Sequence, residues 1–392
     1  ERPRSINKEE LQGNRYDMQG INWDRLETTR ESARDARIKL YQCTRKRPTT
    51  TLSANRPYPL PNTENYFSFR RMNTNHKALI SHFQLRNLIA ATSRNDIFYA
   101  SRSHVIRTDS VGLACDTVMD LNNDKTSMAS IHSAPFDITS MTARDDILIA
   151  GGFRGEYALI DLSSPSTTKP HQGFVSHNYN AITNHIHLFP SRTSPHSAPL
   201  AAFSSNDASF RLLDTATQTF LRTTTYPAAT NCTATSPDSR LRCVVGDFQD
   251  VLITDADTGR PFEAIPAHSD HAFACAWADD GILVATGAQD GNVVIHDARR
   301  WGRPLATLTS SMACPRSLHW SPVGGGKRVL VVAEADDIVR VVDARGWEKQ
   351  QCLELFGTVA GVAVGQDGER IWVANADRRF GGIAEFERRG WA

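Results

Sequence analysis

Three features of this 392-residue chain have residue types and spacing that could do chemistry. His185 and His187 stand two residues apart, so a β-strand would place both imidazoles on one face, where they could bind a metal. Asp279–Asp280 and Asp336–Asp337 are adjacent carboxylates, the group that general acid–base catalysis uses. The run Gly324–Lys327 places three glycines before a lysine, as part of a phosphate-binding loop would. Each feature would imply a metal site or an enzyme.

Each feature also has an ordinary structural explanation. No cysteine or carboxylate pair lies near the two histidines in the sequence, which favours polar side chains on a strand. Turn chemistry favours aspartate at both carboxylate pairs, and the glycine run lacks the spacing of a P-loop. We therefore expect no catalytic residue, no cofactor and no metal site in this chain.

The composition is that of a globular protein with little net charge. Hydrophobic residues make up 40% of the chain, and the net charge is +1. No apolar run approaches the roughly 18–20 residues that span a bilayer, and residues 1–20 are too polar for a signal peptide. The seven cysteines include no CxxC pair, which favours reduced thiols. We expect an intracellular protein of the cytoplasm, the nucleus or both, with no nucleic-acid or membrane partner.

The elements that would position any site repeat along the chain. Six times, two β-rich apolar runs joined by a tight polar turn end at an aspartate, with spacings of 52, 53, 41, 42 and 46 residues. These aspartates are Asp109, Asp161, Asp214, Asp255, Asp297 and Asp343. A period of about 40–50 residues with short strands is typical of a β-propeller, whose blades have four strands each.

A seventh copy follows, in which Glu387 stands 44 residues after Asp343. The chain ends before a fourth strand could form there, and an unclosed ring would expose strand edges. Residues 66–71 (YFSFRR) have the composition of a strand, so we expect them to close the ring as the outer strand of blade seven. The expected fold is all-β, a seven-bladed β-propeller over residues 64–392.

Residues 1–63 are expected to form an N-terminal arm. Residues 1–14 are polar without periodicity and are expected to be disordered. Residues 24–41 lack glycine and proline and are expected to form a short helix, with Asp24 as its cap. Residues 46–63 are rich in proline, threonine and asparagine and predict an extended linker.

One repeat carries the motifs of a known family. Residues 267–299 (AHSDHAFACAWADDGILVATGAQDGNVVIHDAR) resemble a WD repeat, with Ala267–His268 in place of Gly-His and His296–Asp297 in place of Trp-Asp. In that family a His, a strand Ser or Thr, a turn Asp and the Trp form a hydrogen-bonded tetrad. The resemblance implies a structural tetrad of His268, Thr286, Asp290 and His296, in which His296 replaces the Trp.

A second resemblance lies upstream. The segment Tyr16–Trp23 (YDMQGINW), followed by Arg30, Arg34 and Arg37, is similar to a segment that precedes the propeller in a fungal and plant family of WD-repeat proteins. Some fungal relatives in that family resemble substrate receptors of a GID-type ubiquitin ligase. The resemblance implies a multisubunit ligase as one candidate partner.

In WD-repeat propellers, the turn between the second and third strands of each blade lies on the face that usually binds ligands. This resemblance places candidate partner-binding residues at those turns. They are Arg102, Phe153, Arg154, Phe248, Gln249, Asp250, Gln289, Glu334, Asp337 and Arg378. Phe153 and Phe248 are unusual there, because turns favour small polar residues and an aromatic beside an arginine resembles a binding hot spot. The alternative is that each ring packs over a degraded tetrad.

Three functions are compatible with these features. The first is a non-enzymatic module that binds a protein or peptide on this face. In its ligase-receptor version, Asp250, Glu334 or Asp337 would bind the N-terminal ammonium of a ligand. The second is a structural scaffold subunit that docks into an assembly through its N-terminal arm. The third, which the sequence favours least, is a propeller enzyme with a central cluster of ionisable groups.

Overall fold

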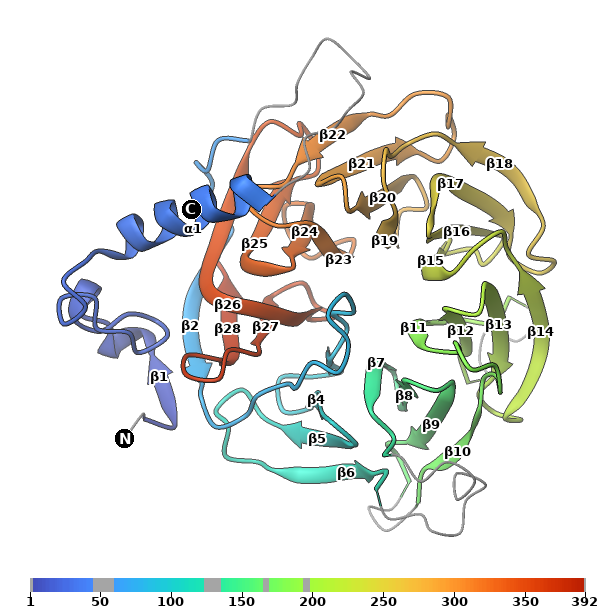
Figure 1. Cartoon of the computed structure of the whole chain (residues 1–392), viewed down its shortest axis with the longest axis horizontal. Coiled ribbons are helices and arrows are strands. Elements are labelled where there is room, and N and C mark those ends of the chain that lie inside the picture. The colour runs from blue at the N-terminus through green and yellow to red at the C-terminus, as the bar shows by residue number, and fades with distance from the viewer. Residues whose placement is uncertain (1–2, 45–59, 123–134, 165–168, 193–197, 391–392) are drawn as a thin grey trace.

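The computed structural model of the chain is a seven-bladed β-propeller, a disc of sheets arranged around a central axis (Figure 1). The structure describes residues 3–44, 60–122, 135–164, 169–192 and 198–390. Most of the predicted linker, residues 45–59, lies outside the described residues. The all-β expectation is confirmed.

Five blades are separate four-stranded antiparallel sheets whose strands follow chain order. Blades one to three consist of β3 (Ile89–Ala91), β4 (Ile97–Ser101), β5 (His104–Thr108), β6 (Asp116–Asp120), β7 (Ile138–Arg144), β8 (Ile147–Gly152), β9 (Glu156–Asp161), β10 (His171–Phe174), β11 (Thr183–Phe189), β12 (Leu200–Ser205), β13 (Ser209–Asp214) and β14 (Thr219–Thr225). Blades four and five consist of β15 (Thr230–Thr235), β16 (Leu241–Gly246), β17 (Phe248–Asp255), β18 (Pro261–Ile265), β19 (Ala272–Trp277), β20 (Leu283–Ala288), β21 (Asn292–Asp297) and β22 (Ala306–Thr309).

Blades six and seven share one long strand. Blade six consists of β23 (Pro315–Trp320), β24 (Val329–Glu334), β25 (Asp336–Asp343) and the first part of β26 (Gln350–Val364). The second part of β26 starts blade seven, followed by β27 (Arg370–Asn375) and β28 (Gly382–Arg388).

The ring closes as predicted. Strand β2 (Phe67–Asn73) pairs antiparallel with β28, with Phe67 opposite Arg388 and Asn73 opposite Ile383. It supplies the fourth strand of blade seven, although the strand begins one residue later than expected. A further strand, β1 (Ser5–Asn7), then pairs with β2 and covers its outer edge.

The six repeating aspartates end or directly follow the third strands, and each carboxylate accepts a backbone N–H two or three residues further on. Asp297, for example, accepts the N–H of Arg299 at 2.9 Å. Such bonds fold the turn into the fourth strand, which explains why one residue type recurs at this position.

The blades are held together by apolar packing between their faces. The six residues of β24 are all buried, as are those of β8 and β15. Strands packed on both faces favour continuous apolar runs, as in β8 and β24, whereas the buried polar side chains of β15 make hydrogen bonds such as that of Thr230 to the Ser205 carbonyl at 3.1 Å.

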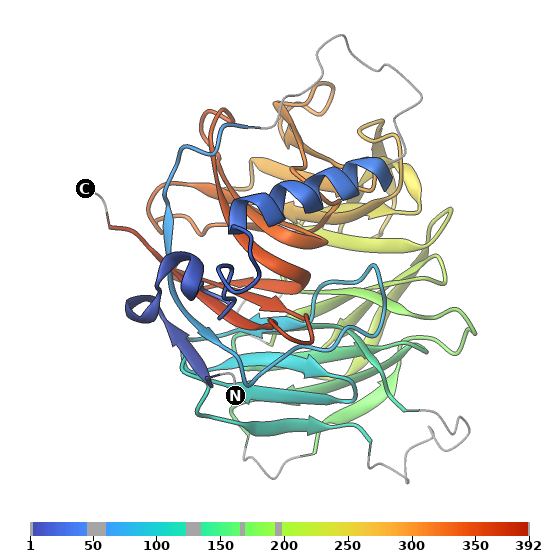
Figure 2. The ribbon, with the colours of Figure 1, turned by 60° about the vertical axis from the view of Figure 1, so that its left-hand side comes forward.

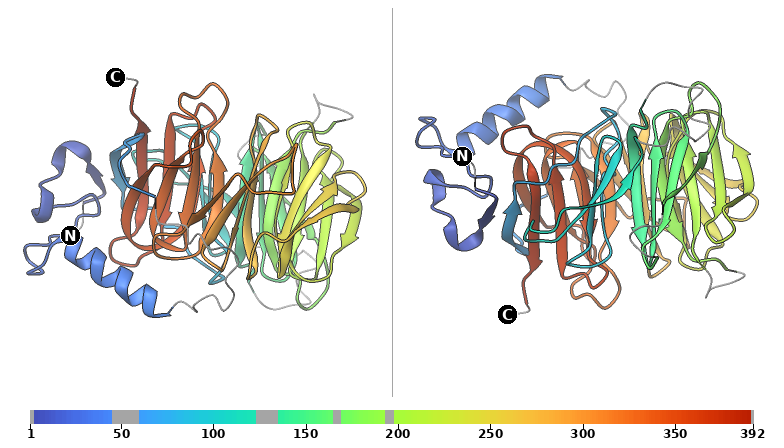
Figure 3. Two further views of the ribbon diagram at one scale, coloured as in Figure 1. Left: turned by 90° about the horizontal axis from the view of Figure 1, so that it is seen from above. Right: turned by 90° about the horizontal axis from the view of Figure 1, so that it is seen from below.

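The N-terminal arm is more ordered than the sequence predicts. Residues 1–14 were expected to be disordered, but residues 3–15 contain β1 and the short 3-10 helices Lys8–Glu10 and Gly13–Arg15. The helix α1 spans Arg30–Thr44, so the expected start at Asp24 is wrong. Thr29 begins it instead, because its hydroxyl accepts the N–H of Ser32 at 3.1 Å, as an N-cap side chain does. Figures 2 and 3 show α1 lying along one flat face of the disc, over the last blades.

Candidate interaction face

We call "top face" the flat face that carries the turns between the second and third strands of the blades. These turns are residues 102–103, 153–155, 206–208, 247, 289–291, 335 and 376–381. The entries to the first strands lie on the same face. The N–H of Phe153 donates to the carbonyl of Asp137 at 3.0 Å, and that of Ala335 donates to Cys314 at 2.9 Å. The helix α1 also lies on this face, over blades six and seven (Figure 3).

Asp17 organises the arm. It is 7% exposed, and its carboxylate accepts the backbone N–H groups of Gln19 at 2.8 Å and Ile21 at 2.9 Å. The same carboxylate accepts the indole N–H of Trp23 at 2.8 Å and a guanidinium N–H of Arg30. One buried anion therefore joins the YDMQGINW segment to the first turn of α1.

Gln19 and Phe356 attach this segment to the propeller. The Gln19 amide donates to the Phe356 carbonyl at 2.8 Å and accepts the Phe356 N–H at 2.5 Å. The Phe356 ring lies 4.8 Å from Trp23 and 4.2 Å from the Arg34 guanidinium. The arm thus satisfies backbone groups of β26 at the point where the strand passes from blade six to blade seven.

Asp337 anchors α1. Its carboxylate accepts Arg34 Nη1 at 2.6 Å, two N–H groups of Arg37, and the N–H of Gly357 at 2.6 Å. Asp337 is fully buried and has φ of 63°, a left-handed conformation that aspartate tolerates better than most residues. Arg34 also donates to the Leu355 carbonyl and lies 3.5 Å from the Glu354 carboxylate.

Two residues expected at the binding surface are instead buried. Glu334 and Asp337 each have 0% exposure. The Glu334 carboxylate accepts three N–H groups from residues 311–313 and lies 3.1 Å from Arg340 Nε. The expectation that both carboxylates are exposed on the top face is therefore wrong. A buried carboxylate needs hydrogen bonds or a positive charge nearby, and both carboxylates obtain these from groups of the same chain.

Five other candidates are exposed. They are Arg102, Gln249, Asp250, Gln289 and Arg378. Gln249 and Asp250 lie in β17 rather than in a turn, because that strand begins at Phe248. The binding role of all five residues stays a prediction.

The two phenylalanines have different surroundings. Phe153 is partly exposed, and its ring lies 5.9 Å from His82. Its neighbour Arg154 donates to the Pro135 carbonyl at 2.9 Å and lies 3.7 Å from Glu156. Phe248 packs against the apolar cluster between blades three and four and covers Gly246. Both rings are partly exposed, but Phe248 packs into an interblade core and Phe153 lies beside His82.

The expected tetrad is present in part. His268 contacts Thr286 Oγ1 at 2.9 Å and Asp290 Oδ2 at 3.3 Å, and Asp290 also accepts the N–H of Ser269. His296 is buried with its ring 6.4 Å from Trp301. Burial, together with the nearby His268, lowers the pKa of His296 to about 4. Blade five therefore keeps the His–Thr–Asp part of the motif.

The other groups considered for chemistry have structural partners. His187 accepts the N–H of Thr235 from the next blade at 3.2 Å, and Asp280 accepts the N–H of Ile282 at 2.8 Å. Within the described residues, no group of three or more His, Cys, Asp or Glu side chains could hold a metal ion. None of the helices in that part of the chain is long and apolar enough to cross a membrane.

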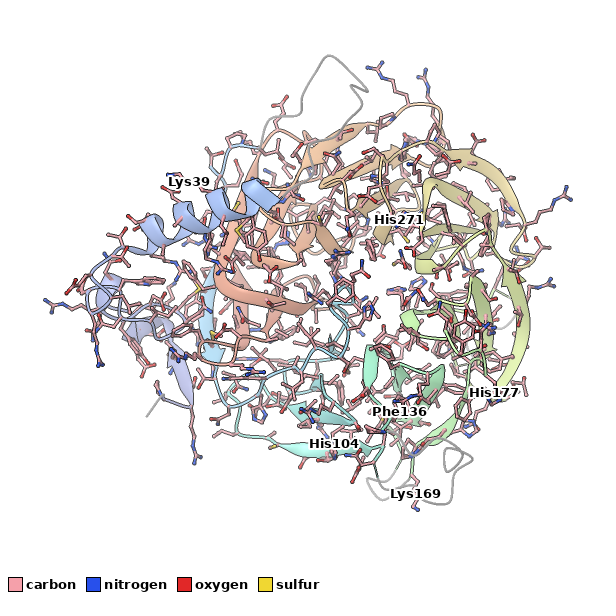
Figure 4. All side chains as sticks on the ribbon, viewed as in Figure 1. Lys39, His104, Phe136, Lys169, His177 and His271 are labelled. Atoms are coloured by element: carbon pink, nitrogen blue, oxygen red, sulfur yellow. The ribbon has the colours of Figure 1, made fainter. Side chains whose placement is uncertain are left out.

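A cluster that the sequence did not reveal lies on the inner part of the top face. We call it the axial cluster: His82, Arg86, Phe153, Phe273 and Arg316. Its members come from the segment before β3, the blade-two turn, β19 and β23. His271 lies on the inner side of blade five (Figure 4), and its carbonyl accepts the N–H of Gln289 at 2.8 Å. His104 and Lys169 lie toward the outer rim (Figure 4). Arg86 follows an irregular segment with no repeat counterpart, so no pattern predicted it.

The comparisons with known proteins agree with this architecture. No protein-family model matches the chain. The chain is 24% identical over 326 residues to an uncharacterised protein of Schizosaccharomyces pombe, covering 76% of this chain and 87% of that relative. It is similar to a chain in the crystal structure of a mitotic checkpoint complex, with a TM-score of 0.63 and 16% identity, covering 88% of this chain and 97% of the other.

The structural likeness supports the WD-repeat resemblance at the level of the fold. The resemblance of the YDMQGINW segment to the fungal and plant family stays a prediction, although the relative found is a fungal protein.

Proposed function

We propose that the chain is a non-enzymatic interaction module that binds a protein or peptide on the part of the top face that the arm leaves open. The observation that carries the proposal is the division of this face. The arm covers blades six and seven, where it binds Asp337 and Phe356. Exposed or partly exposed side chains at the other blades include Arg102, Phe153 and Gln289. An accessible aromatic among polar groups on a rigid scaffold favours protein recognition.

A substrate receptor of a GID-type ubiquitin ligase is the finer version of this proposal. Its support is the YDMQGINW resemblance. Of the carboxylates considered for binding an N-terminal ammonium, Asp250 is exposed, whereas Glu334 and Asp337 are engaged within the chain. In this version the protein acts in the cytoplasm, the nucleus or both, and its partners are the ligase and a substrate.

The test is affinity purification from the native organism with the full chain and two variants. Phe153→Ala removes the accessible ring, whereas Arg345→Ala changes an exposed residue in the turn after β25, on the opposite face. We expect Phe153→Ala to lower recovery of the partner by about tenfold, as loss of a hot spot of about 1.4 kcal/mol or more would do. Equal recovery with all three proteins would contradict binding at the top face.

A scaffold that docks through the arm is the second candidate. Leu26 and Leu40, which lie on the arm, are 57% and 62% exposed. Deleting residues 1–50 would not test this idea cleanly, because the deletion also removes β1 and the contacts to Asp337. The double change Leu26→Ser and Leu40→Ser leaves those contacts in place. Loss of the partner with this variant, but not with Phe153→Ala, would favour docking through the arm.

A further inference from the structure

Arg86 and Arg316 bring two positive charges close together in the axial cluster. Arg86 is 7% exposed, and its Nη1 donates to the carbonyls of His82 at 3.2 Å and Leu85 at 3.1 Å. Its Nε has no hydrogen-bond partner in the structure. Arg316 stacks over Phe273 at 4.1 Å and has two buried nitrogens, Nε and Nη1, without partners. Unpaired N–H groups of a cation in such a place cost stability, which a bound acceptor would restore.

The charges around these two guanidiniums do not form close ion pairs with them. Burial lowers the pKa of Arg86 to about 10; Asp336 and Tyr41 oppose this shift, and Arg316 adds to it. Burial also lowers the pKa of Arg316, against the effects of Cys314, Asp336 and Asp270. Asp336 therefore acts on both arginines at longer range, without taking up their free N–H groups.

One neutral acceptor already occupies the outer edge of Arg316. The side-chain oxygen of Gln289 accepts Arg316 Nη2 at 3.1 Å, and Gln289 is exposed on the top face. An amide oxygen is a weaker partner for a guanidinium than a carboxylate, whose hydrogen bonds to arginine are roughly twice as strong. Because Gln289 is on the surface, its side chain can rotate away and leave this edge of Arg316 to an incoming group.

Aromatic side chains lie against Arg316 and against His82. Phe273 forms the floor under Arg316, and Phe153 lies beside His82. The next residue, Phe83, has its side chain 74% exposed and 4.9 Å from His82. An arginine stacked on an aromatic ring, with a replaceable acceptor on its open edge, is suited to a planar anion next to an apolar group.

We propose that the axial cluster binds a carboxylate of an acidic peptide segment, with Arg316 as its direct partner, Arg86 as the second positive charge and Gln289 as the group it displaces. This inference rests on the proposed function, since it names the chemistry that the top face would recognise. An aspartate or glutamate side chain and a free C-terminus supply the same group. Phe153 and Phe83 would contact apolar residues of the same segment.

The experiment uses the full chain and a random peptide library. Peptides selected on the wild-type protein are synthesised with an amidated C-terminus, and again with each acidic residue changed to its amide. A third form has a free C-terminus. Their Kd values are measured by fluorescence anisotropy on the wild type, Arg316→Met, Gln289→Glu, Phe153→Ala and, as a matched control, Arg345→Met on the opposite face. Thermal unfolding of each variant checks the fold.

The variant Gln289→Glu places a carboxylate beside Arg316 within the chain. We expect it to weaken the selected peptides by about tenfold while its Tm stays at or above that of the wild type, because the new ion pair competes with the ligand. Arg316→Met should weaken the same peptides by about tenfold or more. Arg345→Met should have no effect. A peptide that needs its free C-terminus identifies the terminal carboxylate, and one that needs an acidic side chain identifies that group.

The outcomes separate this inference from the proposed function. Peptides that lose binding with Phe153→Ala, but need no carboxylate and tolerate Gln289→Glu, would overturn the carboxylate site and leave the proposed function standing. If no peptide is selected, or if binding is indifferent to both Phe153→Ala and Arg316→Met, the proposed function fails as well.

Discussion

Two pairs of arginines on the top face have opposite surroundings. Arg34 and Arg37 from α1 meet at the carboxylate of Asp337, which also accepts the N–H of Gly357. Among the described residues, Arg86 and Arg316 in the axial cluster have no such shared anion, and both keep nitrogens without hydrogen-bond partners, as Arg34 does at Nε alone. The first pair joins two parts of one chain, whereas the second has unused hydrogen-bonding capacity on the inner part of the same face.

The difference shows how one residue type serves two purposes. A buried carboxylate that is saturated by arginines fixes an element in place, because removing either partner leaves an uncompensated charge. Arginines that retain free donors next to an exposed, neutral acceptor are suited to a partner from outside. The contacts of the arm are therefore the structural side of the top face, and the axial cluster, which includes Arg316 of blade six, is its recognition side.

The strongest test of the structural side is Asp337→Ala. The change leaves the 5%-exposed Arg34 side chain without its buried anion, so we expect the free energy of unfolding to fall by about 3–5 kcal/mol. Urea unfolding measures the loss, and limited proteolysis should show faster cleavage within residues 3–44. The matched control is Asp35→Ala, an exposed aspartate on the same helix, which should cost less than about 0.5 kcal/mol. Equal effects of the two changes would mean that Asp337 does not anchor the arm.

A smaller loss is expected at the other end of the arm, from Gln19→Leu. The leucine cannot accept the Phe356 N–H or donate to its carbonyl, so the buried N–H loses its partner, whereas the carbonyl keeps the side-chain amide of Asn375 at 2.9 Å. We expect about 1–3 kcal/mol less stability in the same unfolding assay. Gln12→Leu, at an exposed position of the arm, is the control and should be close to neutral. A neutral Gln19→Leu would show that the YDMQGINW segment is held by other contacts.

The fold could be predicted from the sequence because its signals are local and repeated. Each repeating aspartate makes hydrogen bonds within its own turn, and the closing strand at residues 67–73 has the composition of a β-strand. Both could therefore be recognised from a few consecutive residues. The helix start was missed because Thr29, rather than Asp24, makes the capping contact. Local chemistry allowed both residues, and the tertiary contacts of α1 decided between them.

The surface could be predicted only in part. The sequence correctly placed Arg102, Phe153 and Gln289 in turns, but it did not predict that Glu334 and Asp337 are buried. Burial there depends on Arg340 and on α1, which reach these carboxylates from elsewhere in the blade or from about 300 residues earlier in the chain. The axial cluster likewise combines residues 82–86 with Phe153, Phe273 and Arg316, which no single repeat contains.

The smallest effect, and the most direct measure of charge on the recognition side, is the pKa of His82. Burial lowers this pKa below its usual value, and the nearby Arg86 and Arg316 lower it further. Arg316→Met removes one positive charge, so the pKa of His82 should rise, which NMR titration of the imidazole resonances would detect. Arg345→Met should leave it unchanged. Protonation of His82 as the pH falls adds positive charge to the axial cluster, so a bound carboxylate ligand should in turn raise the pKa of His82. A ligand that binds without raising it would place its anion away from Arg86 and Arg316, and the two sides of the top face would then differ in packing rather than in recognition.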